Sequence, residues 1–286
     1  MGERPHIEYI QAQVLPWQAS APGGARPGTD IRILSAETVV PENGACSMLI
    51  RYPSGWTLGE THTLPGDEEF LVLDGNLRIG DRTFGRRGYG FLPVGFPRAG
   101  MAAPDGAVVL TFFEGPQKRI TTLAGGHDAA RLVLADTETM PYDYGFEHKL
   151  AGSEIGIKRL REDPYTGERT WILTKGPDTR ENLPKTGHLE HHPDCVEEMY
   201  LLDGELRWPQ GPMRAGAYFW RPAGLLHGPG ASLTGFRAFF RTRGGPFSTT
   251  YIDEIRPRPL DMPAYRPVLP DYLRAIARED AGHTPY

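Results

Sequence analysis

The chain has 286 residues and a formal net charge of −5, with 39% hydrophobic and 23% charged residues. This length allows one large or two ordinary domains with a sizeable core, and the mixed charges exclude a basic surface for nucleic acid or an anionic membrane. The longest strongly apolar run, Ala107–Phe113, is too short to span a bilayer. The first residues lack the basic-then-apolar form of a secretion signal, and two cysteines are too few for a disulfide framework. We therefore expect a cytoplasmic protein.

Short apolar runs bounded by turn residues predict a chain built from β-strands. The 35 glycines and 27 prolines are spread between these runs, which is typical of many short strands joined by turns. A short helix is expected near the C-terminus, over Pro270–Arg278. The expected strands, in chain order, are Pro5–Ile10, Ile31–Leu34, Ala45–Tyr52, Glu69–Asp74, Asn76–Ile79, Tyr89–Leu92 and Ala107–Phe113.

The second half of the chain repeats the first. The segment Glu68–Arg78 matches Glu197–Arg207 in eight of eleven positions by identity or close type, and Gly88–Pro93 matches Gly216–Pro222. A constant offset of about 124 to 129 residues indicates one unit present twice, with small insertions. Each copy has the size of one β-sandwich or barrel. The predicted domains are residues 1–125 and 126–286.

Two spaced patterns in the second copy resemble the motifs of cupin domains. The pattern Gly, five residues, Pro-x-Gly, two residues, His occupies Gly216–His227, and His, four residues, Glu, six residues, Gly occupies His192–Gly204. The chain thus resembles a bicupin. The resemblance implies an all-β fold of two tandem cupin (double-stranded β-helix, or jelly-roll) barrels with a short C-terminal helix. The Glu-Glu-x-x-x-Leu-Asp-Gly pattern also resembles the cupin half of ChrR-type anti-sigma factors.

The resemblance implies that His192, Glu197 and His227 bind a metal ion. Placing two imidazoles and a carboxylate inside a small barrel is costly unless they have partners, and a divalent cation accepts their lone pairs. Nitrogen-rich sites with one carboxylate suit transition metals. We expect one divalent transition metal, with Fe(II) favoured and Mn, Ni, Co or Zn as alternatives.

The fourth ligand departs from the cupin motif, which has a histidine two residues before His192 where this chain has Glu190. In an extended strand, residues 188, 190 and 192 share one face, so His188 is our predicted fourth ligand. Glu190 is an alternative, and so is His191 if a β-bulge shifts the register.

The first copy departs further from the motif. It has Glu60, His62 and Glu68 in the first pattern, and Arg98 stands where the second copy has His227. A guanidinium group is always charged and cannot bind a cation. We therefore interpret His62, Glu68 and Arg98 as a degenerate site, in which Glu60, His62 and Glu68 pair with Arg98 in a polar core.

The resemblance implies a metal-dependent enzyme, with a non-haem Fe(II)-type dioxygenase acting on a small oxygenated organic substrate as the leading hypothesis. Glu197 and Glu190 are the candidate catalytic residues because carboxylates can carry protons, and Tyr200 and Phe219 are the candidate pocket walls. The alternatives are a Mn-, Ni- or Zn-dependent isomerase, decarboxylase or lyase, or a non-catalytic sensor that binds a metal or small molecule. Cupins commonly form homodimers, so a homodimer is one assembly open to this chain.

Overall fold

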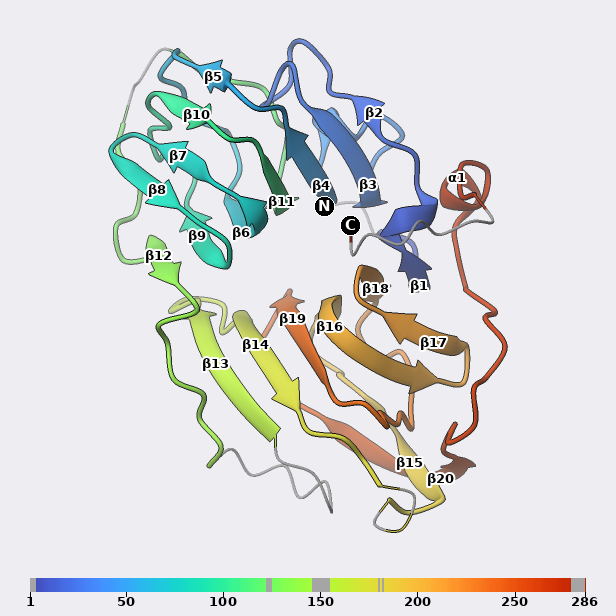
Figure 1. Ribbon diagram of the computed structural model, residues 1–286. Helices are drawn as coiled ribbons and strands as arrows, with labels where there is room; N and C mark the ends of the chain where they lie inside the picture. Colours follow the sequence, from blue (N-terminus) through green and yellow to red (C-terminus); the bar gives the residue numbers. More distant parts are fainter. Residues whose placement is uncertain (1–3, 122–124, 146–154, 180, 182, 279–285) are drawn as a thin grey trace. The chain divides into compact units, whose positions relative to one another are not determined.

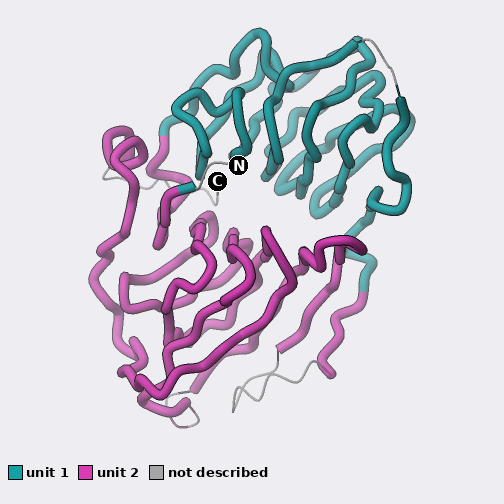
Figure 2. The backbone as a smooth tube through the Cα atoms, turned by 180° about the vertical axis from the view of Figure 1, so that it is seen from behind, with its two compact units in different colours: residues 1–4, 16–140 teal, residues 5–15, 141–286 magenta. Residues whose placement is uncertain are grey.

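The computed structural model describes residues 4–121, 125–145, 155–179, 181, 183–278 and 286. The regular secondary structure of these residues is almost entirely β-strand (Figure 1), and the predicted short C-terminal helix is present as α1 (Asp271–Arg274). The expected all-β class is therefore confirmed. The chain divides into two compact units, residues 1–4 with 16–140 and residues 5–15 with 141–286 (Figure 2). No helix among the described residues has the length and apolar character needed to cross a membrane.

The first unit contains two antiparallel sheets. Its elements are β2 (Gln18–Ala19), β3 (Asp30–Ala36), the 3-10 helix η2 (Pro41–Asn43), β4 (Cys46–Tyr52), β5 (Trp56–Leu58), β6 (Glu68–Gly75), β7 (Leu77–Ile79), β8 (Arg82–Phe84), β9 (Gly88–Leu92), β10 (Met101–Ala103), β11 (Ala107–Phe113) and β12 (Val133–Asp136). The larger sheet has the order β12-β9-β6-β11-β4-β3-β2, and the smaller one the order β5-β10-β7-β8. The six strands predicted here from sequence all occur, with bounds that differ by at most two residues.

Alternation along the strands of the first unit places one set of side chains in its core. In β6, Phe70 and Val72 belong to the buried hydrophobic cluster, and Glu68 shares their parity and therefore their face. The same face of β4 contributes Met48 and Ile50. A charged residue at the start of an otherwise apolar stripe thus points into the barrel.

The larger sheet of the second unit repeats the strand order of the first, and its smaller sheet differs. Its elements are β1 (Ile7–Gln11), the 3-10 helix η1 (Ala12–Val14), β13 (Ile155–Glu162), β14 (Arg169–Lys175), β15 (Thr186–His191), β16 (Val196–Trp208), β17 (Gly211–Arg214), β18 (Ala217–Arg221), β19 (Phe236–Arg243), β20 (Thr250–Pro257) and α1. The larger sheet has the order β1-β18-β16-β19-β14-β13, with β17 paired to β16, and β15 and β20 form a two-stranded sheet.

The inner face of β16 repeats the pattern of β6. Met199 and Leu201 lie in the buried cluster with Phe219 and Phe240, and Glu197 shares their parity. The buried carboxylates Glu68 and Glu197 therefore occupy equivalent places at the start of equivalent strands.

The strand before each repeat pairs with a strand of the other repeat. β1, which precedes the first copy, pairs with β18 of the second, whereas β12, which precedes the second copy, pairs with β9 of the first. Sequence alone predicted a strand at Pro5–Ile10 but not its partner. The predicted domain boundaries, 1–125 and 126–286, do not account for this exchange of strands, because residues 5–15 group with the second unit. These boundaries stay a prediction.

The glycines that end the first motif are required by close approach of the backbone. Gly75 and Gly204 have φ values of +71° and +80°. A Cβ atom at either position would lie 2.2 Å from a carbonyl oxygen, that of Gly106 or of Gly235. Only glycine fits there, which explains why both copies keep a glycine seven residues after the buried glutamate.

Candidate metal centre

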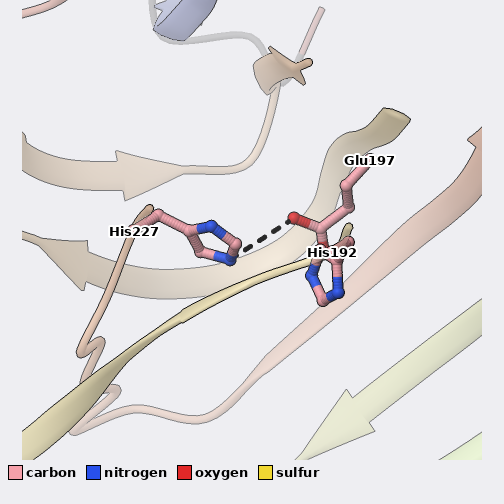
Figure 3. A group of neighbouring side chains, drawn as sticks. All are labelled: His192, Glu197 and His227. Carbon is pink, nitrogen blue, oxygen red and sulfur yellow. Dashed lines mark ion pairs between the residues drawn. The ribbon is translucent and has the colours of Figure 1, made fainter. Parts of the chain in front are cut away.

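Three side chains of the second unit converge on one point inside the barrel (Figure 3). His192 follows β15, Glu197 lies on β16, and His227 lies in the loop after β18. The Nε2 atom of His192 is 3.5 Å from Oε1 of Glu197, and Nε2 of His227 is 3.8 Å from Oε2 of the same carboxylate. All three residues are buried, and one potential ligand atom of each lies within 4.8 Å of the others. The two-histidine, one-carboxylate group expected from the motif is thus assembled.

The outer nitrogens of both imidazoles are held by backbone carbonyls. Nδ1 of His192 lies 2.8 Å from the carbonyl oxygen of Ser248, and Nδ1 of His227 lies 3.0 Å from that of Leu225. Since a carbonyl only accepts, these contacts assign the proton to Nδ1 and leave the Nε2 lone pair facing Glu197. Although burial opposes it, the hydrogen bond and charge of Glu197 raise the pKa of His192, so a proton can occupy the space between these two side chains. With both imidazoles neutral, their lone pairs and the carboxylate form a donor set that fits a divalent metal ion.

The charges around Glu197 also leave room for a cation. Arg221 donates from Nη1 to Oε2 of Glu197 at 3.0 Å and from Nε to Glu8 of β1 at 2.7 Å. Although burial opposes its ionisation, the contact with His192 and the charge of Arg221 hold the pKa of Glu197 below its usual range. Burial likewise opposes ionisation of Glu8, but Arg221 lowers the pKa of this carboxyl to about 2. The carboxyl groups of Glu8 and Glu197 are therefore both ionised, and they share the single positive charge of Arg221.

A third carboxyl group belongs to the same cluster. Oε1 of Glu190 lies 3.6 Å from Nε2 of His227, and the two residues form a backbone bridge. Burial and the charge of Glu197 raise the pKa of Glu190. Burial and the charge of Arg221 lower the pKa of His227 to about 4, so this imidazole is neutral. Burial and the charge of Glu197 thus disfavour the ionised form of Glu190, and a bound divalent cation would reverse that preference.

The structure does not bring the predicted fourth ligand His188 to the triad. Its side chain is exposed, and its Nδ1 contacts the carbonyl oxygen of Ile252 at 2.9 Å. Both His188 and Glu190 line the cavity next to the triad, as their shared parity predicts, and Oε1 of Glu190 comes to within 3.6 Å of Nε2 of His227. His191, whose parity differs from that of Glu190 and His192, is not in the group either. Of the three candidates, Glu190 alone contacts a triad residue.

A cavity of about 810 Å³ opens from the triad into the second unit. Phe219, one of the two predicted pocket walls, lines it. The prediction for Tyr200 is not supported, because Tyr200 has the opposite parity to Glu197 on β16, is buried, and is not among the lining residues.

The equivalent place in the first unit holds cations of its own. His62 forms a backbone bridge with Arg98, as Glu190 does with His227. Nε of Arg98 donates to Oε2 of Glu68 at 2.6 Å, and Arg26 forms an ion pair with the other oxygen of Glu68. The predicted pairing of Glu68 with Arg98 is therefore observed.

This bridge also corrects the alignment of the two copies. It makes His62 the counterpart of Glu190, so Leu64, buried in the hydrophobic cluster, stands where the second unit has His192. Glu60 does not join the cluster as predicted, since its side chain lies near Arg119 at 3.4 Å.

Sequence reasoning missed three residues that shape these sites. Arg26 lies in a Gly- and Pro-rich loop, and Glu8 lies on a strand more than 200 residues from its partner Arg221. No local sequence pattern predicts contacts between segments that lie so far apart in the chain. Arg221 precedes the proline of the second motif, and its parity on β18, shared with Phe219, was the available signal.

Comparisons with known proteins agree with this architecture. A family model described as a domain of unknown function, DUF4437, matches residues 10–246. No match was found among curated proteins. Among solved structures, a provisionally assigned dioxygenase from Nostoc punctiforme is 15% identical, with a TM-score of 0.72 over 90% of this chain and 91% of that chain.

Two oxalate decarboxylases are also similar. The enzyme from Lactobacillus farciminis is 13% identical, with a TM-score of 0.55 over 85% of this chain and 88% of that chain. A variant of the Bacillus subtilis enzyme is 13% identical, with a TM-score of 0.51 over 86% and 79%. At these identities the likeness shows the fold alone. It supports the double cupin architecture expected from the motifs; it does not extend to the ChrR-type resemblance.

Proposed function

The chain belongs to the DUF4437 family, a domain of unknown function, and we propose that its second unit is a metal-dependent enzyme. The leading form of the proposal is a non-haem Fe(II)-type dioxygenase acting on an oxygenated organic substrate. The observation that carries it is the buried group of His192, Glu197 and His227 at the end of a cavity. Two histidines and one carboxylate with open positions are typical of non-haem Fe(II) oxygenases.

A metal held in this way supplies open coordination positions for a bidentate oxygen substrate and for O2. The protein supplies the rest. The carbonyls of Ser248 and Leu225 fix the two imidazoles, and Arg221, anchored by Glu8, fixes the carboxylate of Glu197. Such outer contacts orient ligands and preserve the open geometry.

Glu190 is the candidate proton carrier. Its carboxyl group contacts His227 and accepts a hydrogen bond from the hydroxyl of Tyr251, which also lines the cavity. A carboxyl group within reach of both the triad and the cavity can take or return a proton during turnover. Glu197 has less freedom for this role, because His192 and Arg221 hold it ionised.

The test is metal analysis of anaerobically purified protein, followed by O2 uptake with a panel of diketones and catechol-like compounds. The dioxygenase proposal predicts stoichiometric Fe(II) binding and O2 consumption with at least one compound of the panel. Absence of O2 uptake with every bound metal would rule out the dioxygenase proposal.

A second candidate is a Mn-dependent decarboxylase or lyase. It is favoured by the position of Glu190, because a proton carrier beside the metal is what replacement of a carboxyl group by hydrogen needs, and by the fold shared with oxalate decarboxylases. Release of CO2 without O2 consumption would select it. Ligand binding without turnover under any metal would instead select a non-catalytic sensor, the role implied by the ChrR-type resemblance.

A further inference from the structure

The cavity beside the triad is much larger than a two-carbon acid needs. Its volume of about 810 Å³ lies in the upper part of the range that encloses drug-sized organic ligands. Trp171 and Phe240 line it, with their rings stacked and their centroids 5.3 Å apart. Phe247 also lines it, and its ring centroid lies 4.5 Å from that of His192, which carries the aromatic wall to the triad. A ligand that fills the cavity therefore has an apolar body as well as the atoms that meet the metal.

The positively charged side chains that line the cavity differ in how their charge is balanced. Most form ion pairs with carboxylates, in the pairs Arg159–Asp143, Arg161–Asp163, Arg169–Glu162, Lys175–Asp178, Arg221–Glu8 and Arg221–Glu197. Arg258 also lines the cavity, is partly buried, and has no carboxylate partner among the described residues. Burial lowers the pKa of Arg258, and the charges of Asp178 and Glu190 oppose this shift without cancelling it. A permanent cation in this situation favours an anionic ligand.

The guanidinium group of Arg258 keeps part of its donor set free. Nε donates to the carbonyl oxygen of Thr186 at 3.3 Å, and Nη1 donates to that of Gly230 at 2.6 Å. Nη2 has no acceptor among the residues that the structure describes and, unlike Nε of Arg169, it is not among the buried nitrogen atoms. The two carbonyls thus hold the group in place without neutralising its charge, and a carboxylate can accept from Nη2.

The surroundings of Nη2 belong to the cavity as well. A Cβ atom at Gly187 would lie 2.7 Å from Nη2 of Arg258 and 2.8 Å from Cβ of Pro229, and all three residues line the cavity. The backbone of Gly187 is outside the left-handed region, so its conformation does not require glycine. The missing side chain instead leaves the space that the guanidinium group occupies.

Arg258 lies at the far end of β15 from the triad. Its backbone N–H donates to the carbonyl oxygen of Lys185 at 2.8 Å, next to the start of the strand, whereas Glu190 contacts the triad near the end of the strand. The strand between Thr186 and Glu190 covers roughly 13 Å at the usual rise per residue. This separation suits a ligand with a carboxylate at one end and an oxygen for the metal at the other.

We propose that the cavity binds a carboxylate with an apolar, aromatic body, and that Arg258 donates to this carboxylate while the other end of the ligand reaches the metal. One guanidinium charge matches a singly charged carboxylate better than a phosphate group, which carries a charge of about −1.5 to −2. Arg258 is then a specificity residue that distinguishes the acid from its neutral analogue. The proposal rests on the proposed function, because it names the substrate class for the same cavity.

The experiment uses 6-hydroxy-2-naphthoate, its neutral carboxamide and acetate as probes, titrated by calorimetry into the full-length protein, both metal-free and metal-loaded. Wild-type protein is expected to bind one equivalent of the naphthoate, about tenfold or more tightly than the carboxamide or acetate. Arg258→Gln removes the charge and should weaken naphthoate binding roughly tenfold to hundredfold, the range for a hydrogen bond to a charged group, while carboxamide binding stays within about twofold.

Arg159→Gln is the matched control. It removes the same charge from another arginine of the cavity lining, one whose side chain is exposed and pairs with Asp143. Because exposed ion pairs and charges have small effects, naphthoate binding is expected to change by less than about threefold in this variant.

Several results would overturn the proposal: no preference for the naphthoate over the carboxamide, acetate binding as tight as naphthoate binding, or an equal loss for both aromatic probes in Arg258→Gln. An unchanged naphthoate affinity in metal-loaded Arg258→Gln would also overturn it, since the carboxylate would then bind the metal instead. If this variant does not fold, the wild-type preference for the naphthoate over the carboxamide decides, and equal affinities would contradict the proposal.

The metal-free titration separates this proposal from the proposed function. Naphthoate binding by a protein that binds no metal would remove the enzyme proposal alone. Metal binding without a preference for the naphthoate would remove the inference about Arg258 alone.

Discussion

The two units place the same buried carboxylate in the same fold and neutralise it in different ways. In the first unit Glu68 lies between two guanidinium groups, those of Arg26 and Arg98. In the second unit, Glu197 contacts one guanidinium group and two imidazoles, and an imidazole, unlike a guanidinium group, can be neutral. A permanent cation satisfies the carboxylate and closes the site, whereas the two imidazoles form with it a donor set that fits a metal ion. The same scaffold therefore accommodates either arrangement.

The opposite faces of the two strands support this comparison. On β6, Glu69 accepts a hydrogen bond from the hydroxyl of Tyr89 at 2.6 Å, and on β16, Glu198 accepts one from Tyr218, also at 2.6 Å. The repeats thus agree in their supporting contacts and differ in the barrel interior. Four predictions test that difference.

The largest expected effect is loss of stability in the first unit on removal of its carboxylate. Glu68→Ala leaves Arg26 and Arg98 buried without their ion pairs, and breaking a buried ion pair in this way costs about 3–5 kcal/mol. Thermal and denaturant unfolding of the purified variant measures this cost. Glu60→Ala removes a half-exposed partner of Arg119 and is the control, with an expected cost below about 1 kcal/mol. Equal costs for the two variants would show that Glu68 is not the anchor of a charged core.

The next effect concerns metal affinity in the second unit. His227→Ala removes a triad ligand and should reduce the affinity for divalent metal by more than the roughly 100-fold that loss of an outer partner can cost. His188→Ala removes an exposed histidine outside the triad and should leave affinity unchanged. Calorimetric titration of both variants with the same metal makes the comparison. Retention of metal by His227→Ala, or its loss in His188→Ala, would reassign the ligands.

A smaller effect is expected at the anchor of Arg221. Glu8→Gln weakens the buried pair that holds Arg221, so this guanidinium competes more strongly for Glu197. We expect metal affinity to fall by about 10–100-fold, the range for loss of an outer contact. Asp203→Asn, which weakens an ion pair with Arg237 elsewhere in the same unit, is the control. An unchanged metal affinity in Glu8→Gln would show that the contact of Glu8 with Arg221 does not affect the metal site.

The smallest effect is a pH dependence in the first unit. Burial and the charge of Arg26 lower the pKa of His62 from 6.5 to about 4. The unfolded chain then binds a proton at a higher pH than the folded one, so stability falls as pH drops below 6.5 and levels off below 4. Between pH 7 and pH 5 this contribution amounts to about 2 kcal/mol. The free energy of unfolding, measured across this pH range, should depend less on pH in His62→Gln than in wild type. An identical pH dependence in the two proteins would show that the pKa of His62 does not change on folding.

Much of this account could be predicted from sequence. The strands and the repeat followed from turn residues, alternation and self-similarity, which depend on neighbours in the chain, and the triad followed from the resemblance of two spaced patterns to the cupin motifs. Glu190, in contrast, was only one of three candidates for the fourth position. Strand parity places His188, Glu190 and His192 on one face, in agreement with the residues that line the cavity, but it does not say which of the first two side chains reaches the triad.

Contacts between distant segments could not be predicted. The pairing of Glu8 with Arg221 depends on β1 joining β18, and that of Arg26 with Glu68 depends on how a loop folds back over a barrel. The alignment of His62 with His192 failed for a related reason. The two copies differ by one residue between the motif histidine and the buried glutamate, and only the cross-strand bridge of His62 to Arg98 reveals which positions correspond.

The most direct test of the central claim is the number of metal ions bound per chain, measured by elemental analysis after equilibrium dialysis against Fe(II) or Mn(II) without oxygen. The account predicts one equivalent per chain, held by the second unit, with no change in Leu64→Ala of the first unit. Two equivalents would show that the first barrel also binds metal, and none would show that the imidazoles of His192 and His227 serve another purpose.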